Sequence, residues 1–147
     1  MTCVHAAGAI MRVLLVENNY SDAIVIAKML TEASLGRGAA VEITSTDRLS
    51  VALEHLRALP PDALILDLGL PEACDLDPFA LAHAAAPGVP CVVLSRAEDE
   101  PAAAAALRGG AQTYLFKAEI TTALLWRSLE HAIELARLTE RILVLTA

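Results

Sequence analysis

The sequence has few aromatic residues and few cysteines, and each shortage excludes a class of protein. Of its 147 residues 56% are hydrophobic but only 3% are aromatic, so a core must be built from Ala, Leu, Val and Ile. The three cysteines, Cys3, Cys74 and Cys91, show no CxxC or CxxH spacing, which indicates neither a disulfide framework nor a zinc site. We therefore expect reduced thiols and a cytoplasmic protein.

Positive charge and long apolar runs are also scarce. The chain carries 11 Lys and Arg against 18 Asp and Glu, a net charge of −7, which is the wrong sign for neutralising nucleic-acid phosphates. The apolar segment from Val4 to Val16 is interrupted by His5 and Arg12, and it is shorter than the ~20 residues that span a membrane. We expect neither a nucleic acid nor a membrane as a partner, and we interpret residues 1–10 as a leader.

What the sequence does contain is an alternation of strand-like apolar runs and amphipathic stretches with helical spacing. Predicted strands cover Arg12–Val16, Val41–Thr44, Ala63–Leu66, Val89–Leu94 and Thr113–Phe116, and predicted helices cover 23–30, 49–56, 76–86, 101–108 and a last stretch from about Thr121. Five βα units with right-handed crossovers give a doubly wound α/β fold with a parallel sheet. The length fits one domain, which we assign to residues 11–137, with residues 138–147 extending the last helix.

Polar residues stand where the predicted strands end. Glu17 and Asn18 follow the first strand, Asp67 and Ser95 follow the two most apolar strands, and Lys117 follows the last. Ligands of open parallel sheets bind beyond the carboxyl ends of the strands. We therefore expect two carboxylates, an amide, a hydroxyl and an ammonium to meet at one edge of the sheet.

Four short motifs in this order resemble the receiver domain of bacterial two-component response regulators. They are Val-Glu-Asn-Asn at 16–19, Leu-Asp-Leu-Gly-Leu-Pro at 66–71, Val-Leu-Ser at 93–95 and Gly-Ala-Gln-Thr-Tyr-Leu-Phe-Lys at 110–117. The resemblance extends from Met11 to about Arg137. It implies a flavodoxin-like (βα)5 fold whose five-stranded sheet has the order 2-1-3-4-5.

The resemblance also implies a role for each acidic residue of the site. Asp67 would accept a phosphoryl group from a histidine kinase or a phosphotransfer protein. A carboxylate needs a cation beside it to meet an incoming phosphate, and Mg²⁺ prefers oxygen ligands. The implied ligands are Glu17, Asn18, Asp67 and the carbonyl of Gly69.

Three further residues would respond to the phosphoryl group. By resemblance, Lys117 is its counter-charge, Ser95 is a hydroxyl that swings to bind it, and Tyr114 is the aromatic side chain whose rotamer follows that swing. Ser95 and Tyr114 are equally compatible with roles in turns or packing. Lys117 could pair with Asp67 and never meet phosphate.

Three positions depart from the family pattern. Asn18 stands where an aspartate normally binds the metal, and the lost charge should weaken Mg²⁺ binding by roughly one to two decades. Cys74 and Asp75 replace an aspartate and a glycine that many relatives carry, so we expect a differently shaped loop over 71–78.

The last predicted helix carries a heptad seam formed by Leu135, Leu138, Ile142 and Leu145. We therefore expect a homodimer, or docking on another protein through the fourth and fifth helices. Because two heptads are a short seam, a helix that merely covers the sheet is an alternative.

Three functions remain open from the sequence. The first is a stand-alone receiver that switches a protein-interaction surface when Asp67 is phosphorylated. The second is a pseudo-receiver of the same fold that acts as a dimerisation or adaptor module without phosphate, an option that Asn18 favours. The third is a phosphatase with an aspartyl-phosphate intermediate, which would need a second aspartate where Gly69 stands. We therefore expect a protein that is not an enzyme.

Overall fold

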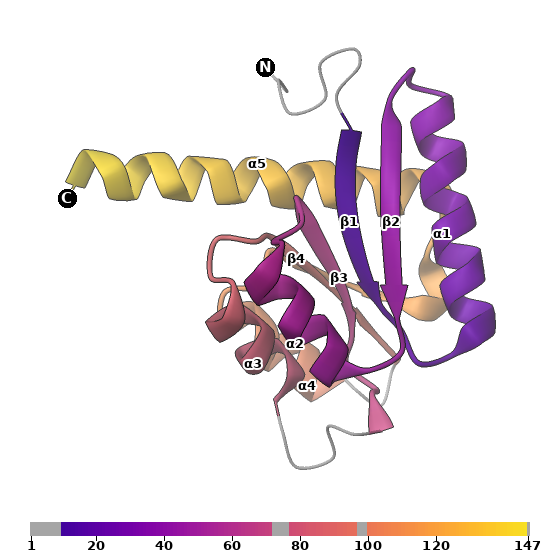
Figure 1. Ribbon diagram of the computed structural model, residues 1–147, viewed down its shortest axis with the longest axis horizontal. Coiled ribbons are helices and arrows are strands. Elements are labelled where there is room, and N and C mark those ends of the chain that lie inside the picture. The colour runs from indigo at the N-terminus through magenta and orange to yellow at the C-terminus, as the bar shows by residue number, and fades with distance from the viewer. Residues whose placement is uncertain (1–9, 72–76, 97–99, 147) are drawn as a thin grey trace.

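The computed structural model describes residues 10–71, 77–96 and 100–146, and within them one parallel sheet is enclosed by helices (Figure 1). The strands are β1 (Ile10–Val16), β2 (Ala40–Thr46), β3 (Ala63–Asp67), β4 (Cys91–Ser95) and β5 (Thr113–Phe116). The helices are α1 (Tyr20–Leu35), α2 (Leu49–Ala58), α3 (Pro78–Ala85), α4 (Glu100–Arg108) and α5 (Thr122–Thr146), with a 3-10 turn over Lys117–Glu119. The strand order is β2-β1-β3-β4-β5, so the predicted order is confirmed.

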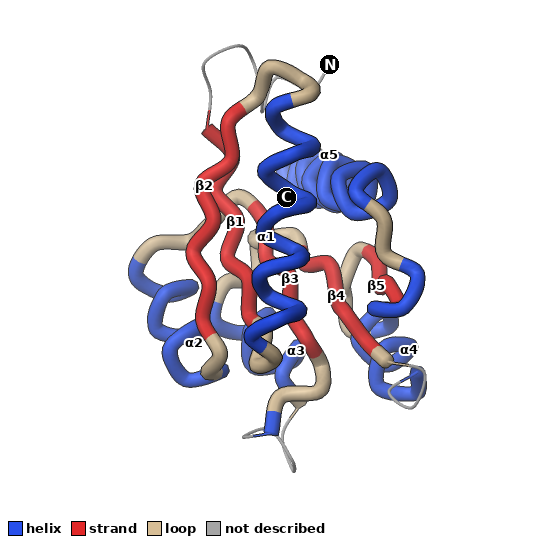
Figure 2. Tube along the Cα trace, turned by 90° about the vertical axis from the view of Figure 1, so that its right-hand side faces the viewer, coloured by secondary structure: helices blue, strands red, loops and turns tan. Residues whose placement is uncertain are grey.

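The central strands are buried on both faces, as their uninterrupted apolar runs predict. Every residue of β3 and β4 is buried, whereas the edge strand β2 alternates between exposed and half-buried residues. One core lies between the sheet and helices α1 and α5, and it includes Leu15, Leu30 and Trp126. The other lies under α2, α3 and α4 and includes Leu56 and Phe79. Figure 2 shows this division of the helices around the sheet.

The ends of the helices follow local signals in the sequence. Asn19 caps α1, because its side-chain oxygen accepts a hydrogen bond from the Asp22 amide at 2.9 Å. Asp77 caps α3 in the same way, and Pro78 occupies the first turn. The helix predicted over 76–86 therefore spans Pro78–Ala85. The rest of the loop that carries Cys74 and Asp75 lies outside the described residues.

Helix α5 is the longest element of the fold. Its 25 residues correspond to about 37 Å, and Figure 1 shows its C-terminal part projecting beyond the sheet. Leu125 and Leu129 are fully buried under the sheet, whereas Leu138, Ile142 and Leu145 are 43%, 60% and 83% exposed. The predicted heptad positions thus lie mostly on the projecting part. Within the described ranges no helix, α5 included, is long and apolar enough to cross a membrane.

Two substitutions on α2 should separate core packing from helix propensity. Leu56 is 1% exposed and belongs to the second core, so Leu56→Ala should lower the free energy of unfolding by about 2–5 kcal/mol. Val51 on the same helix is 44% exposed, and Val51→Ala should change it by less than about 0.5 kcal/mol. Urea unfolding followed by circular dichroism measures both. Equal losses would contradict the assignment of this core.

Candidate phosphoacceptor site

The sheet register brings the predicted site residues to one edge. Val16 is paired with Leu66, Asp67 with Leu94, and Ser95 with Phe116, so four strands end at nearly the same level. Glu17 and Lys117 immediately follow β1 and β5. The expected convergence is therefore seen for Glu17, Asp67, Ser95 and Lys117.

The ammonium of Lys117 is the centre of the site. Its Nζ lies 2.8 Å from Oε1 of Glu17, 3.3 Å from Oδ2 of Asp67 and 3.3 Å from Oδ2 of Asp22. It also donates a hydrogen bond to Oε2 of Glu17 at 3.0 Å. The side chains of Glu17 and Asp67 are 0% and 2% exposed, that of Lys117 is 13% exposed, and that of Asp22 is 40% exposed. A lysine ammonium has three N–H donors, which matches the three carboxylates around it.

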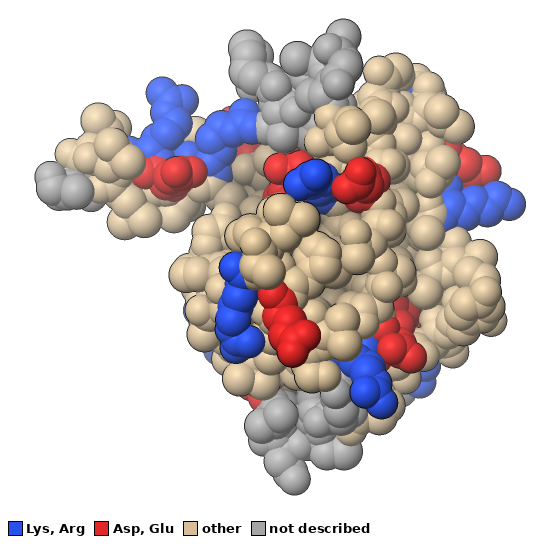
Figure 3. Space-filling view, in the orientation of Figure 1, with Lys and Arg blue, Asp and Glu red and all other residues tan. Residues whose placement is uncertain are grey.

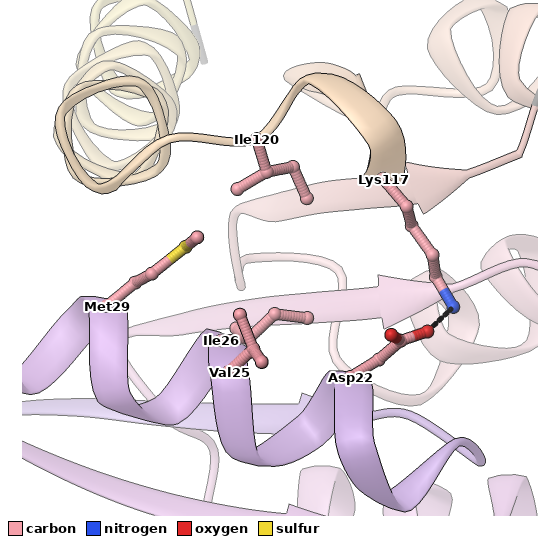
Figure 4. Close-up of a pocket in the computed structure, with 6 residues that line it drawn as sticks. All are labelled: Asp22, Val25, Ile26, Met29, Lys117 and Ile120. Atoms are coloured by element: carbon pink, nitrogen blue, oxygen red, sulfur yellow. Dashed lines mark hydrogen bonds and ion pairs between the residues drawn. The ribbon is translucent and has the colours of Figure 1, made fainter.

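Asp22 is the site residue that sequence reasoning missed. Figure 4 shows it on the first turn of α1 with its carboxylate directed at Lys117. The cap that begins α1 fixes its position, because Asn19 accepts from the Asp22 amide and itself donates its backbone N–H to Glu17. The available signal was an acid in the first turn of a helix that begins beside Glu17. Such an acid is also common as a partner of the helix dipole, so the signal was weak.

Asp67 is held from two sides. Its Oδ1 accepts a hydrogen bond from the Gly69 amide at 3.0 Å, and its Oδ2 faces Lys117. The loop after β3 therefore orients the carboxylate toward the ammonium.

Ser95 has an unusual environment for a hydroxyl. It is 0% exposed, and its Oγ has no hydrogen-bond partner among the described residues. An unpaired buried hydroxyl costs free energy, so it suits a group that gains its partner when a ligand arrives. Ser95 lines an open cavity of about 530 Å³ together with Asp22 and Lys117.

Two predicted site residues, Asn18 and Tyr114, are not among the described side chains that pair with the ammonium. Asn18 is exposed, and none of the described side chains forms a hydrogen bond with its amide group. Tyr114 is half-buried, and its ring meets that of Phe116 edge to face, with the centroids 5.4 Å apart. The backbone amide of Gly69 points to Asp67, as described above.

Burial and neighbouring charges shift two protonation equilibria. Burial and the adjacent Asp67 raise the pKa of Glu17 to about 7, although the hydrogen bonds from Lys117 and the Asn19 amide act to lower it. Burial alone would lower the pKa of Lys117, but the hydrogen bond to Glu17 and the charges of Asp67, Glu17 and Asp22 raise it. The pocket therefore favours a cation beside its carboxylates.

The side chains present fit a divalent cation in chemistry. Glu17 and Asp67 provide buried oxygen ligands, and Oε1 of Glu17 has no hydrogen bond of its own. Mg²⁺ is commonly held by one or two carboxylates plus waters. Among the described residues no three acidic, histidine or cysteine side chains form a ready-made metal site. Lys117 lies between the carboxylates that a metal would use.

The fold and this acidic edge define a class of signalling domain, and comparison with known proteins gives the family. The family model of the response regulator receiver domain matches residues 13–127. The chain therefore belongs to the response regulator receiver family. No curated protein sequence matches it at a significant level.

Solved structures agree with this fold. NtrX from Brucella abortus superposes with a TM-score of 0.73 at 23% identity, over 91% of this chain and 29% of that one. A receiver domain protein from Clostridium thermocellum gives 0.69 at 19% identity, over 90% and 98%. Full-length FixJ from B. japonicum gives 0.75 at 18% identity, over 89% and 61%. The chain thus spans less than a third of the NtrX chain and most of the Clostridium one.

Glu17→Gln should make stability less dependent on pH. A carboxyl group whose pKa is raised from 4.5 to about 7 stabilises the folded state below pH 4.5, and this stabilisation is lost as the pH rises through 7. As the pH rises from 5.5 to 8, the wild type should therefore lose stability that the variant does not lose. The free energy of unfolding of the variant should rise by about 1–2 kcal/mol relative to that of the wild type over this range. Urea unfolding in the presence of EDTA measures the difference.

The matched control for this experiment is Glu54→Gln, which removes an exposed carboxylate from α2. If the stability of Glu54→Gln relative to the wild type rose with pH as much as that of Glu17→Gln, the effect would not come from the buried site.

Ser95→Ala should leave the fold as stable as before or up to about 1 kcal/mol more stable, because it removes a buried hydroxyl without a partner. Ser34→Ala is the comparison. Ser34 is equally buried, but its hydroxyl donates to the Thr31 carbonyl at 2.8 Å, so that variant forfeits a hydrogen bond. Thermal unfolding of both variants tests this. A clear loss of stability in Ser95→Ala would show that the hydroxyl has a structural partner.

Proposed function

We propose that this receiver domain accepts a phosphoryl group on Asp67 and uses the modification to switch a protein-interaction surface. The observation that carries the proposal is the buried Asp67 carboxylate, held by the Gly69 amide and facing the Lys117 ammonium at the open end of the sheet. The unpartnered Ser95 hydroxyl in the adjoining cavity supports it.

In the proposed reaction an Asp67 oxygen attacks the phosphorus of a phosphohistidine. The O–P bond forms as the P–N bond breaks, and the imidazole nitrogen that leaves takes up a proton. Lys117 lies where it can neutralise the phosphoryl oxygens, and Ser95 can donate its hydroxyl to one of them. Mg²⁺, held by Glu17, Asp67, the Gly69 carbonyl and the Asn18 side chain, would offset the repulsion between carboxylate and phosphate.

The partners follow from this chemistry. The phosphoryl donor would be a histidine kinase or a phosphotransfer protein in the cytoplasm. Tyr114, whose ring contacts Phe116 on β5, would carry the change toward α4 and α5, the surface proposed for a second copy or a partner protein. Figure 3 shows charges of both signs along the projecting part of α5. The Glu134–Arg137 ion pair lies on the same helix. We propose a signalling role without turnover of a diffusible substrate.

A pseudo-receiver that works without phosphate is the second candidate. Asn18 supports it, because the amide removes one acidic ligand and lies exposed in the structure. Lys117 supports it too, since the ammonium already pairs with both buried carboxylates and offsets part of their charge.

The intact mass of the chain after incubation with acetyl phosphate and Mg²⁺ separates the two candidates. We expect the wild type to gain one phosphoryl group, Asp67→Ala to gain none, and Asn18→Asp to gain it about tenfold faster because it restores a charged metal ligand. Asp62→Ala is the control, because Asp62 is exposed and bonds the Arg12 amide far from the acidic edge. A gain in Asn18→Asp alone would favour the pseudo-receiver.

A further inference from the structure

Three carboxylates, not two, converge on the Lys117 ammonium. Glu17 and Asp67 are the buried acids expected of a receiver, and Asp22 is an additional one from α1. All three lie within 3.3 Å of the same nitrogen. They are therefore grouped around one ammonium at the edge of the sheet, although Lys117 now stands where a cation would bind.

The number of acids matters because of Asn18. Without Asp22, an aspartate at position 18 would give the acidic edge three carboxylates, whereas the amide leaves only Glu17 and Asp67. Asp22 returns the number to three. Its side chain is 40% exposed, so it faces the solvent from which a hydrated cation would enter, whereas Glu17 and Asp67 form the buried floor.

Two other atoms indicate that the pocket is built for a ligand. Oε1 of Glu17 is buried and has no hydrogen bond, although it lies within ion-pair distance of Lys117. Oγ of Ser95 is buried without a partner, and Ser95 lines the same cavity as Asp22 and Lys117. The Lys117 ammonium compensates the Glu17 oxygen, whereas the buried Ser95 hydroxyl costs free energy unless a ligand supplies a partner.

Asp22 is also held in place by other residues. Asn19 accepts from the Asp22 amide and donates to Glu17, so one residue sets the distance between the two acids. On its other side Asp22 borders a small cavity lined by Val25, Ile26 and Met29, which places its carboxylate at the polar rim (Figure 4).

We propose that Asp22 provides the acidic charge that Asn18 lacks, and that a divalent cation in this pocket is held by Glu17 and Asp67 with Asp22 as the third carboxylate. Asp22 binds the cation through a water molecule, because Mg²⁺ keeps several of its waters. Lys117 moves aside when the cation arrives, since both positive charges cannot occupy the space between the carboxylates. This inference rests on the metal-dependent form of the proposed function.

Binding of Mn²⁺ to the full chain tests the proposal, with the EPR signal of free Mn²⁺ as the readout. Mn²⁺ accepts the same oxygen ligands as Mg²⁺. We expect Asp22→Asn to raise the dissociation constant roughly fivefold to tenfold, because a partly screened carboxylate–dication attraction is lost. Asn18→Asp should lower the constant, and Asn18→Asp combined with Asp22→Asn should bind at least as tightly as the wild type.

The matched control is Glu32→Gln, which removes an exposed carboxylate from the same helix ten residues further along. At 1.5 Å per residue this carboxylate lies about 15 Å away, beyond the screening length at physiological salt, and the dissociation constant should not change. Asp22→Glu should retain binding. Loss of a helix-dipole contact could lower the stability of Asp22→Asn, but it would leave Mn²⁺ affinity unchanged.

Two results would overturn the inference. One is equal Mn²⁺ affinity of the wild type and Asp22→Asn. The other is binding by Asn18→Asp with none by the wild type. Neither result decides whether Asp67 is phosphorylated, which the mass measurement reports separately. Conversely, Mn²⁺ binding that depends on Asp22, without any phosphoryl gain, would remove the proposed function and keep the metal site.

Discussion

The ion-pair cluster around Lys117 joins segments that are far apart in the sequence. The ammonium follows β5, while its partners follow β1, end β3 and begin α1, up to 100 residues away. Burying carboxylates is unfavourable unless a cation compensates them, so the ends of these elements must meet for the cluster to be stable. The arrangement of strand ends and the charge balance of the pocket therefore depend on each other.

Even with the ammonium in place, two groups of the pocket remain incompletely compensated. The ammonium offsets part of the negative charge, but the pKa of Glu17 stays raised to about 7, and the Ser95 hydroxyl has no partner. Natural folds tolerate such costs mainly at functional sites. These incompletely paired groups lie at one edge of the sheet, whereas the two cores on its faces are apolar.

Much of the fold could be predicted from the sequence because its signals are local. The short apolar runs of β3 and β4 favour buried strands, and five βα units predict a parallel sheet. The order of the strands came from the family resemblance, and the observed sheet confirms it. The predicted helix boundaries are less exact where a single capping residue sets the start of the helix. The predicted third helix began before Asp77, whose side chain instead caps it.

Only part of the candidate site could be predicted from the sequence. Glu17, Asp67, Ser95 and Lys117 end strands, so their meeting follows from the topology. Asp22 lies inside a helix, and its contact with Lys117 depends on how α1 leaves the sheet, which a hydrogen bond of Asn19 determines. The burial of Ser95 without a partner likewise depends on side-chain packing that no spacing pattern reports.

The uninterrupted length of α5 has a mechanical consequence. The helix is anchored at one end by Leu125, Trp126 and Leu129, and Arg37, in the turn after α1, lies over the Trp126 ring at 5.6 Å. Because a helix of this length behaves as a stiff rod, a rotation of about 5° at its anchored end would displace the far end by roughly 3 Å. A sub-ångström rearrangement beside β5 would thus be converted into a displacement large enough to change which surface another molecule meets.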